Sequence, residues 1–251
     1  MAFTKNHVKE INPSDAEINN LLQCFQNGQY DDAEKLAQFL TERFPKHQFA
    51  WKVLGAVLQL TGRMPEALVA NQKSVQLVPQ DAEAHSNLGA TLQANRRLDE
   101  AVASYTQAIA VKPDYAEAYN NLGITLRDLG RLEESEASYT KAIALKPDYT
   151  EAHSNLGITL QDLGRLSEAE ASYTKAIALK PDYAAAFWNL SSCEKTIKDA
   201  EHWIDKCLIA DANYLEATLT KAALKFYQGD KTVFDNLMLS EFKQHPYMRS
   251  F

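Results

Sequence analysis

The sequence has little glycine, proline or cysteine, and each shortage excludes a class of protein. Nine Gly and eight Pro in 251 residues are too few for a collagen-like or low-complexity chain. The three cysteines, Cys24, Cys193 and Cys207, are an odd number and lack the spacing of a zinc site. This pattern favours unpaired cysteines in a reducing compartment over disulfide bonds. We therefore expect a cytoplasmic protein with three free thiols.

Long apolar runs and basic clusters are also missing. No stretch reaches the roughly 18 apolar residues that cross a membrane, and the N-terminal segment lacks the apolar core of a signal peptide. The chain has 26 Lys+Arg against 33 Asp+Glu, a net charge of −7, and no run of basic residues. It therefore lacks the footprint that binds phosphate backbones. We predict neither a membrane span nor a nucleic-acid partner.

Motifs that carry catalysis are missing as well. The sequence contains no GxSxG, GxxxxGK[ST] or HExxH motif and no glycine-rich loop after a predicted strand. Its six histidines are scattered, and His85 and His153 occupy the place where other parts of the chain have Trp51 and Tyr119. These positions favour rings packed between helices over metal ligands. We expect no enzyme activity, no metal and no cofactor.

The dominant feature of the sequence is a period of 34 residues. Residues 116–149 recur as 150–183 with six differences in 34, and Pro45, Pro79, Pro113, Pro147 and Pro181 follow one another at that interval. Residues 1–13 form an N-terminal extension and 249–251 a tail. Between them we predict repeats 1 to 7, in order 14–47, 48–81, 82–115, 116–149, 150–183, a shortened 184–214 and a degenerate 215–248.

Each repeat predicts two helices. In repeat 4 the apolar and small side chains recur at helical spacing on both sides of Gly130, which ends the first helix, and Pro147 ends the second. The spacing of Asp114 to Glu117 and of Asp148 to Glu151 predicts a capping box at the start of a first helix. One helix pair cannot bury both of its faces, but stacked copies can. The fold class is therefore all-α, a solenoid of antiparallel helix pairs.

Three repeats depart from the pattern. Arg96 stands in the glycine position of repeat 3, so Asn95 or Arg96 must adopt the turn conformation. Repeat 6 has lost residues between its helices, which predicts a tighter turn or a shorter first helix. Repeat 7 keeps an apolar stripe with no further polar helix to cover it, formed by Val233, Phe234, Leu237, Met238 and Phe242.

The repeated positions resemble the signature of the tetratricopeptide repeat family. In repeat 4 the matching residues are Tyr119, Leu122, Gly123, Leu126, Gly130, Ser135, Tyr139, Ala142 and Pro147. The resemblance extends over about the whole chain. It implies a right-handed α-solenoid in which the first helix of each pair lines a concave groove that takes protein or peptide ligands.

One column of polar residues in these first helices stands out as a candidate binding site. An asparagine immediately precedes the leucine of the repeat pattern in four repeats, at Asn87, Asn121, Asn155 and Asn189. An amide offers two donors and one acceptor, so a row of amides can pair with the main chain of an extended peptide. The column is similar to the asparagine ladder of O-linked N-acetylglucosamine transferase. The alternative is that these side chains only solvate the groove or were copied by duplication.

Further groove residues and the local charge refine this prediction. The other candidate ligand-binding residues are Asn120, Arg127, Gln161, Lys52 and Trp188, the last as an apolar anchor. Relatives that grip the acidic tails of chaperones use a Lys and Arg pair where this chain has Glu117 and Asn121. A column of Glu83, Glu117 and Glu151 would repel a carboxylate terminus. We expect a neutral or basic ligand.

The leading functional prediction is a non-catalytic scaffold that binds an extended peptide or a partner helix in its concave groove. One alternative is the substrate-recruiting N-terminal region of a larger bacterial-type transferase, whose catalytic domain lies beyond residue 251. This alternative rests on the uncovered apolar stripe of repeat 7. A second alternative is a scaffold that self-associates through its terminal repeats.

Overall fold

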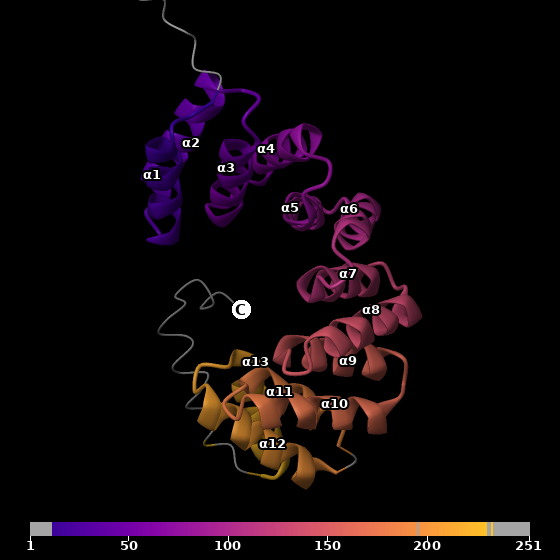
Figure 1. Cartoon of the computed structure of the whole chain (residues 1–251). Helices are drawn as coiled ribbons and strands as arrows, with labels where there is room; N and C mark the ends of the chain where they lie inside the picture. Colours follow the sequence, from indigo (N-terminus) through magenta and orange to yellow (C-terminus); the bar gives the residue numbers. More distant parts are fainter. Residues whose placement is uncertain (1–11, 195, 230–231, 233–251) are drawn as a thin grey trace, which may run out of the picture. The chain divides into compact units, whose positions relative to one another are not determined.

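A computed structural model describes residues 12–194, 196–229 and 232 of the chain, which divides into an N-terminal unit, 1–131, and a C-terminal unit, 132–251 (Figure 1). Every regular element in the described ranges is an α-helix, which confirms the all-α prediction. The N-terminal unit contains α1 (Asp15–Gln26), α2 (Tyr30–Arg43), α3 (Gln48–Leu60), α4 (Met64–Leu77), α5 (Ala82–Ala94), α6 (Leu98–Val111) and α7 (Ala116–Asp128). The C-terminal unit contains α8 (Leu132–Leu145), α9 (Thr150–Asp162), α10 (Leu166–Leu179), α11 (Ala184–Ser191), α12 (Ile197–Ala210) and α13 (Leu215–Tyr227).

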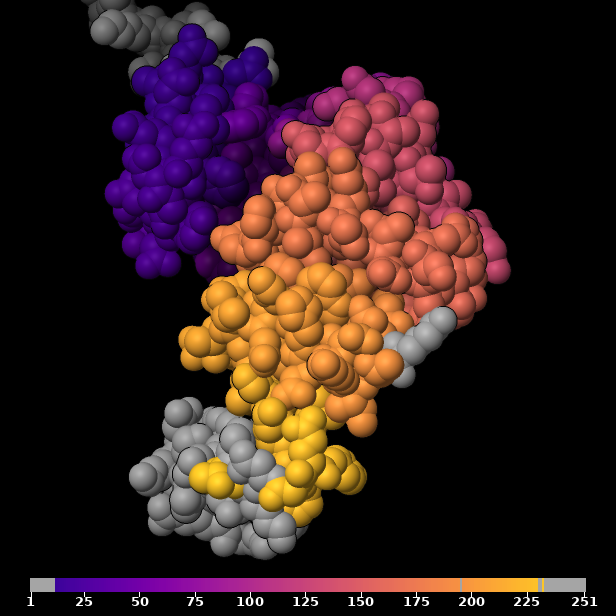
Figure 2. Space-filling model, turned by 90° about the horizontal axis from the view of Figure 1, so that it is seen from below, coloured from indigo at the N-terminus to yellow at the C-terminus, as the bar shows by residue number. Residues whose placement is uncertain are grey.

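Helices that follow one another in the chain pack against each other within each unit. In the N-terminal unit, α1, α3, α5 and α7 also contact one another in succession. These first helices therefore form one layer, and the second helices α2, α4 and α6 cover it from the other side. In the C-terminal unit each helix from α8 to α13 packs against the next one along the chain. The orange and yellow atoms of this unit adjoin one another in the space-filling view (Figure 2).

Two glycines allow the helices of a pair to approach closely. A Cβ atom on Gly89 would lie 2.8 Å from the Tyr105 ring, and one on Gly157 would lie 2.5 Å from the Tyr173 ring. Both tyrosines are fully buried, with 1% and 0% of their surface exposed. The missing side chain therefore makes room for the aromatic ring that fills the contact between α5 and α6, and between α9 and α10.

The turn inside repeat 3 is closed by Arg96. Its φ is 60°, close to the 78° of Gly62 and the 75° of Gly130 in the turns of the neighbouring repeats. Asn95 keeps a φ of −83°, and its Nδ2 donates to the Thr91 carbonyl at 2.8 Å. Of the two candidates for the turn conformation, Arg96 is therefore the residue that adopts it.

The predicted capping boxes are wrong. The residue that precedes α7 is Tyr115 and the residue that precedes α9 is Tyr149, and neither side chain caps its helix. At the same repeat position, one period earlier, Asp81 does cap α5 by accepting from the Ala84 N–H at 3.0 Å. The helices begin one residue later than the Asp–Glu spacing requires, so the aspartates of repeats 4 and 5 lie outside the cap.

Of the two alternatives for repeat 6, a tighter turn or a shorter first helix, the structure shows the shorter helix. Helix α11 has 8 residues, whereas α9 has 13. The side chain of Thr196 then starts α12 by accepting from the Asp199 N–H at 3.1 Å. In repeat 7 the structure describes α13. The apolar stripe that begins at Val233, and Pro246, lie outside the described residues.

Candidate peptide-binding face

The asparagine column lies on the first helices of four repeats. Asn87 is on α5 and Asn121 on α7 of the N-terminal unit, while Asn155 is on α9 and Asn189 on α11 of the C-terminal unit. All four side chains are half-buried. Because α5 and α7 are in contact, the first two amides belong to adjacent helices of one layer.

The backbone beneath the column is fixed by buried side chains. The Thr91 hydroxyl donates to the Asn87 carbonyl at 2.9 Å, and the Thr125 hydroxyl donates to the Asn121 carbonyl at 2.9 Å. Asn71 of α4, which has 0% exposure, donates from Nδ2 to the Thr91 hydroxyl at 2.8 Å. These bonds satisfy the backbone carbonyls of Asn87 and Asn121 within the protein.

The amides differ in their own partners. Asn121 Oδ1 accepts from Asn120 Nδ2 at 3.3 Å. In the described ranges, the side chains of Asn87 and Asn189 make no hydrogen bond. Those two amides therefore have their full hydrogen-bonding capacity available to a ligand.

Two of the other predicted site residues have little to offer a ligand. Asn120 is 4% exposed and contacts Asn121 rather than the surface. Gln161 uses both ends of its amide, because Oε1 accepts from the Tyr173 hydroxyl at 3.0 Å and Nε2 donates to the Ser192 hydroxyl at 3.0 Å. A ligand would have to replace these bonds.

Lys52 is engaged in an ion-pair network. Its Nζ lies 2.6 Å from Glu83 Oε2 and 3.2 Å from Asp81 Oδ2. Burial by itself lowers the pKa of Lys52, but the hydrogen bond and charge of Glu83, together with Asp81, outweigh burial and raise it. The ammonium therefore neutralises acidic residues of the face and is not a free cation.

Trp188 and Arg127 are the last two predicted residues. Trp188 is half-buried beside the buried cluster of repeats 6 and 7, and its ring centroid lies 6.0 Å from that of Tyr214. It holds α11 to the start of α13 instead of standing alone as an anchor. Arg127 is half-buried on α7, and its Nη2 makes a long ion pair of 3.9 Å with Asp128 Oδ1.

The structure adds a hollow that the repeat pattern did not predict. It has a volume of about 400 Å³ on the layer of first helices, at the C-terminal ends of α5 and α7, and its lining residues are Ala90, Gln93, Ala94, Arg96 and Asp128. In the sequence, the sign of this hollow is Arg96, which stands in the glycine position of repeat 3. The small residues Ala90 and Ala94 replace an isoleucine and an aspartate of the neighbouring repeat.

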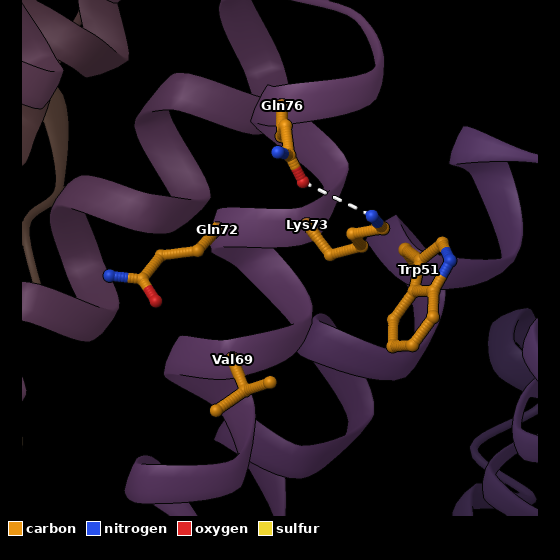
Figure 3. A pocket seen from close by; sticks show the side chains of 5 residues that line it. All are labelled: Trp51, Val69, Gln72, Lys73 and Gln76. Carbon is orange, nitrogen blue, oxygen red and sulfur yellow. Dashed lines mark hydrogen bonds between the residues drawn. The ribbon is translucent and has the colours of Figure 1, made fainter. Parts of the chain in front are cut away.

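A second hollow lies on the other side of repeat 2, against α4. Its volume is about 490 Å³, and it is lined by Trp51, Val69, Gln72, Lys73 and Gln76 (Figure 3). Val69 is 62% exposed, and Lys73 Nζ donates to Gln76 Oε1 at 3.1 Å at one side of the hollow. This hollow is separate from the asparagine column, which lies on the first helices.

The aromatic and histidine rings at the start of each first helix have a structural role. Trp51 Nε1 donates to the Pro45 carbonyl at 3.0 Å, and His85 Nε2 and His153 Nε2 meet the carbonyls of Pro79 and Pro147 at the same distance. Since a proline carbonyl can only accept, each histidine carries its proton on Nε2. His85 and His153 are buried, and each of the three rings is hydrogen-bonded to the proline that precedes its own helix.

A tyrosine immediately precedes each of the helices α7, α9 and α11. The ammonium groups of Lys112, Lys146 and Lys180 lie 4.8, 4.7 and 5.3 Å from the ring centroids of Tyr115, Tyr149 and Tyr183. Burial raises the pKa of Tyr115; a hydrogen bond with Ser86 opposes this, and the charges of Glu83 and Glu117 add to it. Tyr115 therefore lies near Glu83 and Glu117 of the N-terminal unit and stays neutral there.

The described part of the chain lacks two other classes of site. No group of three or more His, Cys, Asp and Glu side chains there is arranged to hold a metal ion. Within the same ranges, no helix has the length and apolar character needed to cross a bilayer.

Comparison with solved structures identifies the same architecture in other proteins. PilF of Pseudomonas aeruginosa superposes with a TM-score of 0.68 at 20% identity, covering 79% of this chain and 92% of that one. TTC0263, a thermophilic TPR protein of Thermus thermophilus, gives 0.58 at 25% identity over 71% and 97%. YrrB, described as a TPR protein with an unusual peptide-binding site, gives 0.58 at 20% identity over 74% and 97%.

Sequence comparison gives the family directly. No curated protein matched the chain. Models of the tetratricopeptide repeat match residues 25–82, 86–150 and 150–183. These matches cover more than half of the sequence and coincide with stacked helix pairs in both units. The chain therefore belongs to the tetratricopeptide repeat family.

Proposed function

We propose that the chain is a protein-interaction scaffold that binds an extended peptide along the face of its first helices. The observation that carries the proposal is the amide column, which places a half-buried asparagine on α5, α7, α9 and α11. Family membership supports a protein or peptide ligand. YrrB, which shares the fold, is itself described as having a peptide-binding site.

The chemistry of the column suits the main chain of a ligand. An extended peptide presents alternating N–H and C=O groups, and a primary amide can pair with both kinds. The buried threonines and Asn71 already satisfy the carbonyls below the amides. The amide groups of Asn87 and Asn189 are therefore free to bind without breaking an internal bond, and recognition of this kind does not depend on the ligand's side chains.

The charge at the N-terminal ends of the helices favours a neutral or basic segment of the ligand there. Glu83, Glu117 and Glu151 are exposed in the first turns of α5, α7 and α9. Lys52 offsets Glu83. A basic side chain of the ligand near Glu151 would gain an attractive interaction that weakens with added salt.

The test is selection from a displayed library of random peptides, followed by affinity measurements on the enriched sequences. The double variant Asn121→Ala with Asn155→Ala removes one amide from each unit. Each lost hydrogen bond is worth about 1 kcal/mol, so we expect affinity to fall by roughly tenfold or more. Circular dichroism and thermal unfolding should match the wild type, because both side chains are partly exposed.

A matched control removes two amides from the other layer. Gln72 and Gln107 are exposed on α4 and α6, and the double variant Gln72→Ala with Gln107→Ala should bind as the wild type does. Equal affinity of the Asn double variant and the wild type would rule out the column as the binding element. The alternatives of transferase recruitment and self-association draw on the ends of the chain and stay predictions; light scattering against concentration tests the second.

A further inference from the structure

The hollow at the C-terminal ends of α5 and α7 has a side-chain chemistry that the amide column does not explain. It lies on the layer of first helices, within the N-terminal unit, and combines small residues with one guanidinium and one carboxylate. Both helices belong to the proposed peptide-binding face (Figure 1).

Several departures from the repeat pattern meet in this hollow. Where repeat 4 has Ile124, Asp128 and Gly130, and repeat 5 has Ile158, Asp162 and Gly164, repeat 3 has Ala90, Ala94 and Arg96. Repeat 2 also has an alanine, Ala56, at the position of Ala90. The changes specific to repeat 3 are therefore Ala94, which removes a negative charge, and Arg96, which introduces a positive one, and both line the same hollow.

Arg96 stays in this position against its backbone preference. It is the sole non-glycine residue with a positive φ in the described ranges, a conformation that strains any side-chain-bearing residue and that glycine would relieve. Backbone strain that persists where a simple substitution would remove it is a feature of functional positions. The backbone of this turn favours glycine, so the reason for an arginine here lies in its side chain.

The guanidinium of Arg96 is available. It makes no ion pair with any residue that the structure describes, whereas the adjacent Arg97 is held by Glu100 at 2.6 Å. Arg96 itself is exposed. A free guanidinium offers parallel N–H donors whose geometry matches a carboxylate.

The remaining polar groups of the hollow are already oriented. The Tyr105 hydroxyl donates to Gln93 Oε1 at 3.4 Å, and Gln93 Nε2 donates to Asp128 Oδ2 at 3.5 Å. Arg127 lies 3.9 Å from the other oxygen of Asp128. With Asp128 offset by Arg127, the charge left over at the hollow is that of Arg96, which is positive.

This positive end is well separated from the acidic column. Glu83 lies in the first turn of α5, and Arg96 follows shortly after the last residue of the helix. A helix of 13 residues is about 20 Å long. The preference for a neutral or basic ligand therefore applies to one end of the face, and the opposite preference applies to the other.

We propose that this hollow is a subsite for an acidic side chain, Asp or Glu, of a peptide ligand, with Arg96 as its charged partner. The inference rests on the proposed function for the identity of the ligand as a peptide. The subsite itself depends on the hollow alone. With this subsite, a face that binds the main chain of the ligand also recognises one of its side chains.

The direct test uses a capped amino acid as the probe, so that it does not require a known peptide. N-acetyl-L-glutamate N-methylamide is titrated into the full chain while NMR follows the arginine Nε–H and glutamine side-chain signals. N-acetyl-L-glutamine N-methylamide is the neutral comparison. We expect the glutamate probe to bind about tenfold more tightly than the glutamine probe, because its contact to Arg96 is charge-assisted.

Three variants assign the effect. Arg96→Gly restores the glycine of the repeat pattern and should abolish the difference in affinity between the two probes. Ala94→Asp should also abolish it, because the new carboxylate fills the hollow and has the same negative charge as the glutamate probe. Arg97→Ala removes a neighbouring guanidinium that is already paired with Glu100 and should leave the difference intact. Equal binding of the two probes to the wild type, or an unchanged difference in Arg96→Gly, would overturn the subsite.

The outcome separates this inference from the proposed function. If library peptides bind through the Asn column but the glutamate probe shows no preference, the scaffold function stands and the acidic subsite falls. If the probe discriminates but the Asn double variant binds library peptides normally, the anion subsite stands and the ladder falls. A third readout is the enriched library itself, in which one position should favour Asp or Glu in the wild type and lose that preference in Arg96→Gly.

Discussion

Arg96 has a backbone conformation that its side chain makes costly. Replacing it with glycine removes that strain, and the Arg96→Gly variant should raise the free energy of unfolding by roughly 0.5–1 kcal/mol. The measurement is urea unfolding followed by circular dichroism. The reverse change, Gly62→Arg, is the control, because Gly62 has a φ of 78° and open space around it. It should lower stability by a similar amount; a neutral or destabilising Arg96→Gly would mean that the side chain stabilises the fold.

Asp81 links the cap of α5 to the ion-pair network of Lys52. Burial by itself raises the pKa of Asp81, but the bond from the Ala84 N–H and the charge of Lys52 outweigh it and lower the pKa below the ordinary 3.8. A carboxyl with a lowered pKa in the folded state contributes stability above its ordinary pKa. That contribution is lost as the pH falls through the folded value.

The variant Asp81→Asn keeps a side-chain oxygen for the cap and removes the charge. At pH 7 it should cost roughly 1 kcal/mol of unfolding free energy, the upper end of the range for a partly exposed ion pair. The difference from wild type should begin to shrink as the pH drops below about 4, where Asp81 becomes neutral in the unfolded chain, and it should vanish once the pH is below the lowered pKa of the folded state. Unfolding curves from pH 2 to 7 measure this, and a difference that is constant across that range would exclude the ionic contribution.

At the scale of the helix pair, Gly157 of α9 lies directly against the Tyr173 ring of α10. A methyl group at Gly157 would lie 2.5 Å from the tyrosine ring, so Gly157→Ala should lower stability by about 1–3 kcal/mol, the usual cost of overpacking. The double variant Gly157→Ala with Tyr173→Leu tests the cause. Because leucine is smaller than tyrosine, it relieves the clash with the new methyl group. The loss of unfolding free energy in the double variant should therefore be smaller than the sum of the losses in the two single variants. Strictly additive losses would mean that the cost of Gly157→Ala does not come from the Tyr173 ring.

Helix pairs and their ends followed from local sequence because the signals are local. A glycine ends each first helix of repeats 4 and 5, and the period places each amide of the column one repeat from the next. The capping boxes failed for a local reason as well, since Tyr115 and Tyr149 take the cap position and leave the aspartates one residue too early.

The state of individual site residues could not be predicted in the same way. Lys52 and Gln161 each have one partner in the next repeat, Glu83 and Ser192 respectively. Whether such side chains meet depends on how closely successive helices stack. The hollow at Arg96 also depends on that spacing, because α7 supplies one of its lining residues. The departure at Arg96 is visible in the sequence, but the space beside it is not.

At the scale of the molecule, contacts join near neighbours in the chain. Stability in such a stack is a sum over repeats and their interfaces. Gly157→Ala should therefore speed amide hydrogen exchange in α9 and α10 while leaving α3 and α4 at wild-type rates. Hydrogen exchange with mass spectrometry resolves these helices. Equal acceleration in all four would instead indicate one cooperative unfolding unit.

The bonds from a ring nitrogen to a proline carbonyl have a consequence for the history of the gene. His153 near the start of repeat 5 meets Pro147 near the end of repeat 4, and His85 meets Pro79 in the same way. A 34-residue block thus carries a donor at its beginning and an acceptor at its end. Unequal recombination that inserts one more block creates two junctions, and each finds its complement already in place. The complementary ends are present in repeats 3 and 5, whereas repeat 4, which differs from repeat 5 at six positions in 34, has Tyr119 in place of the histidine.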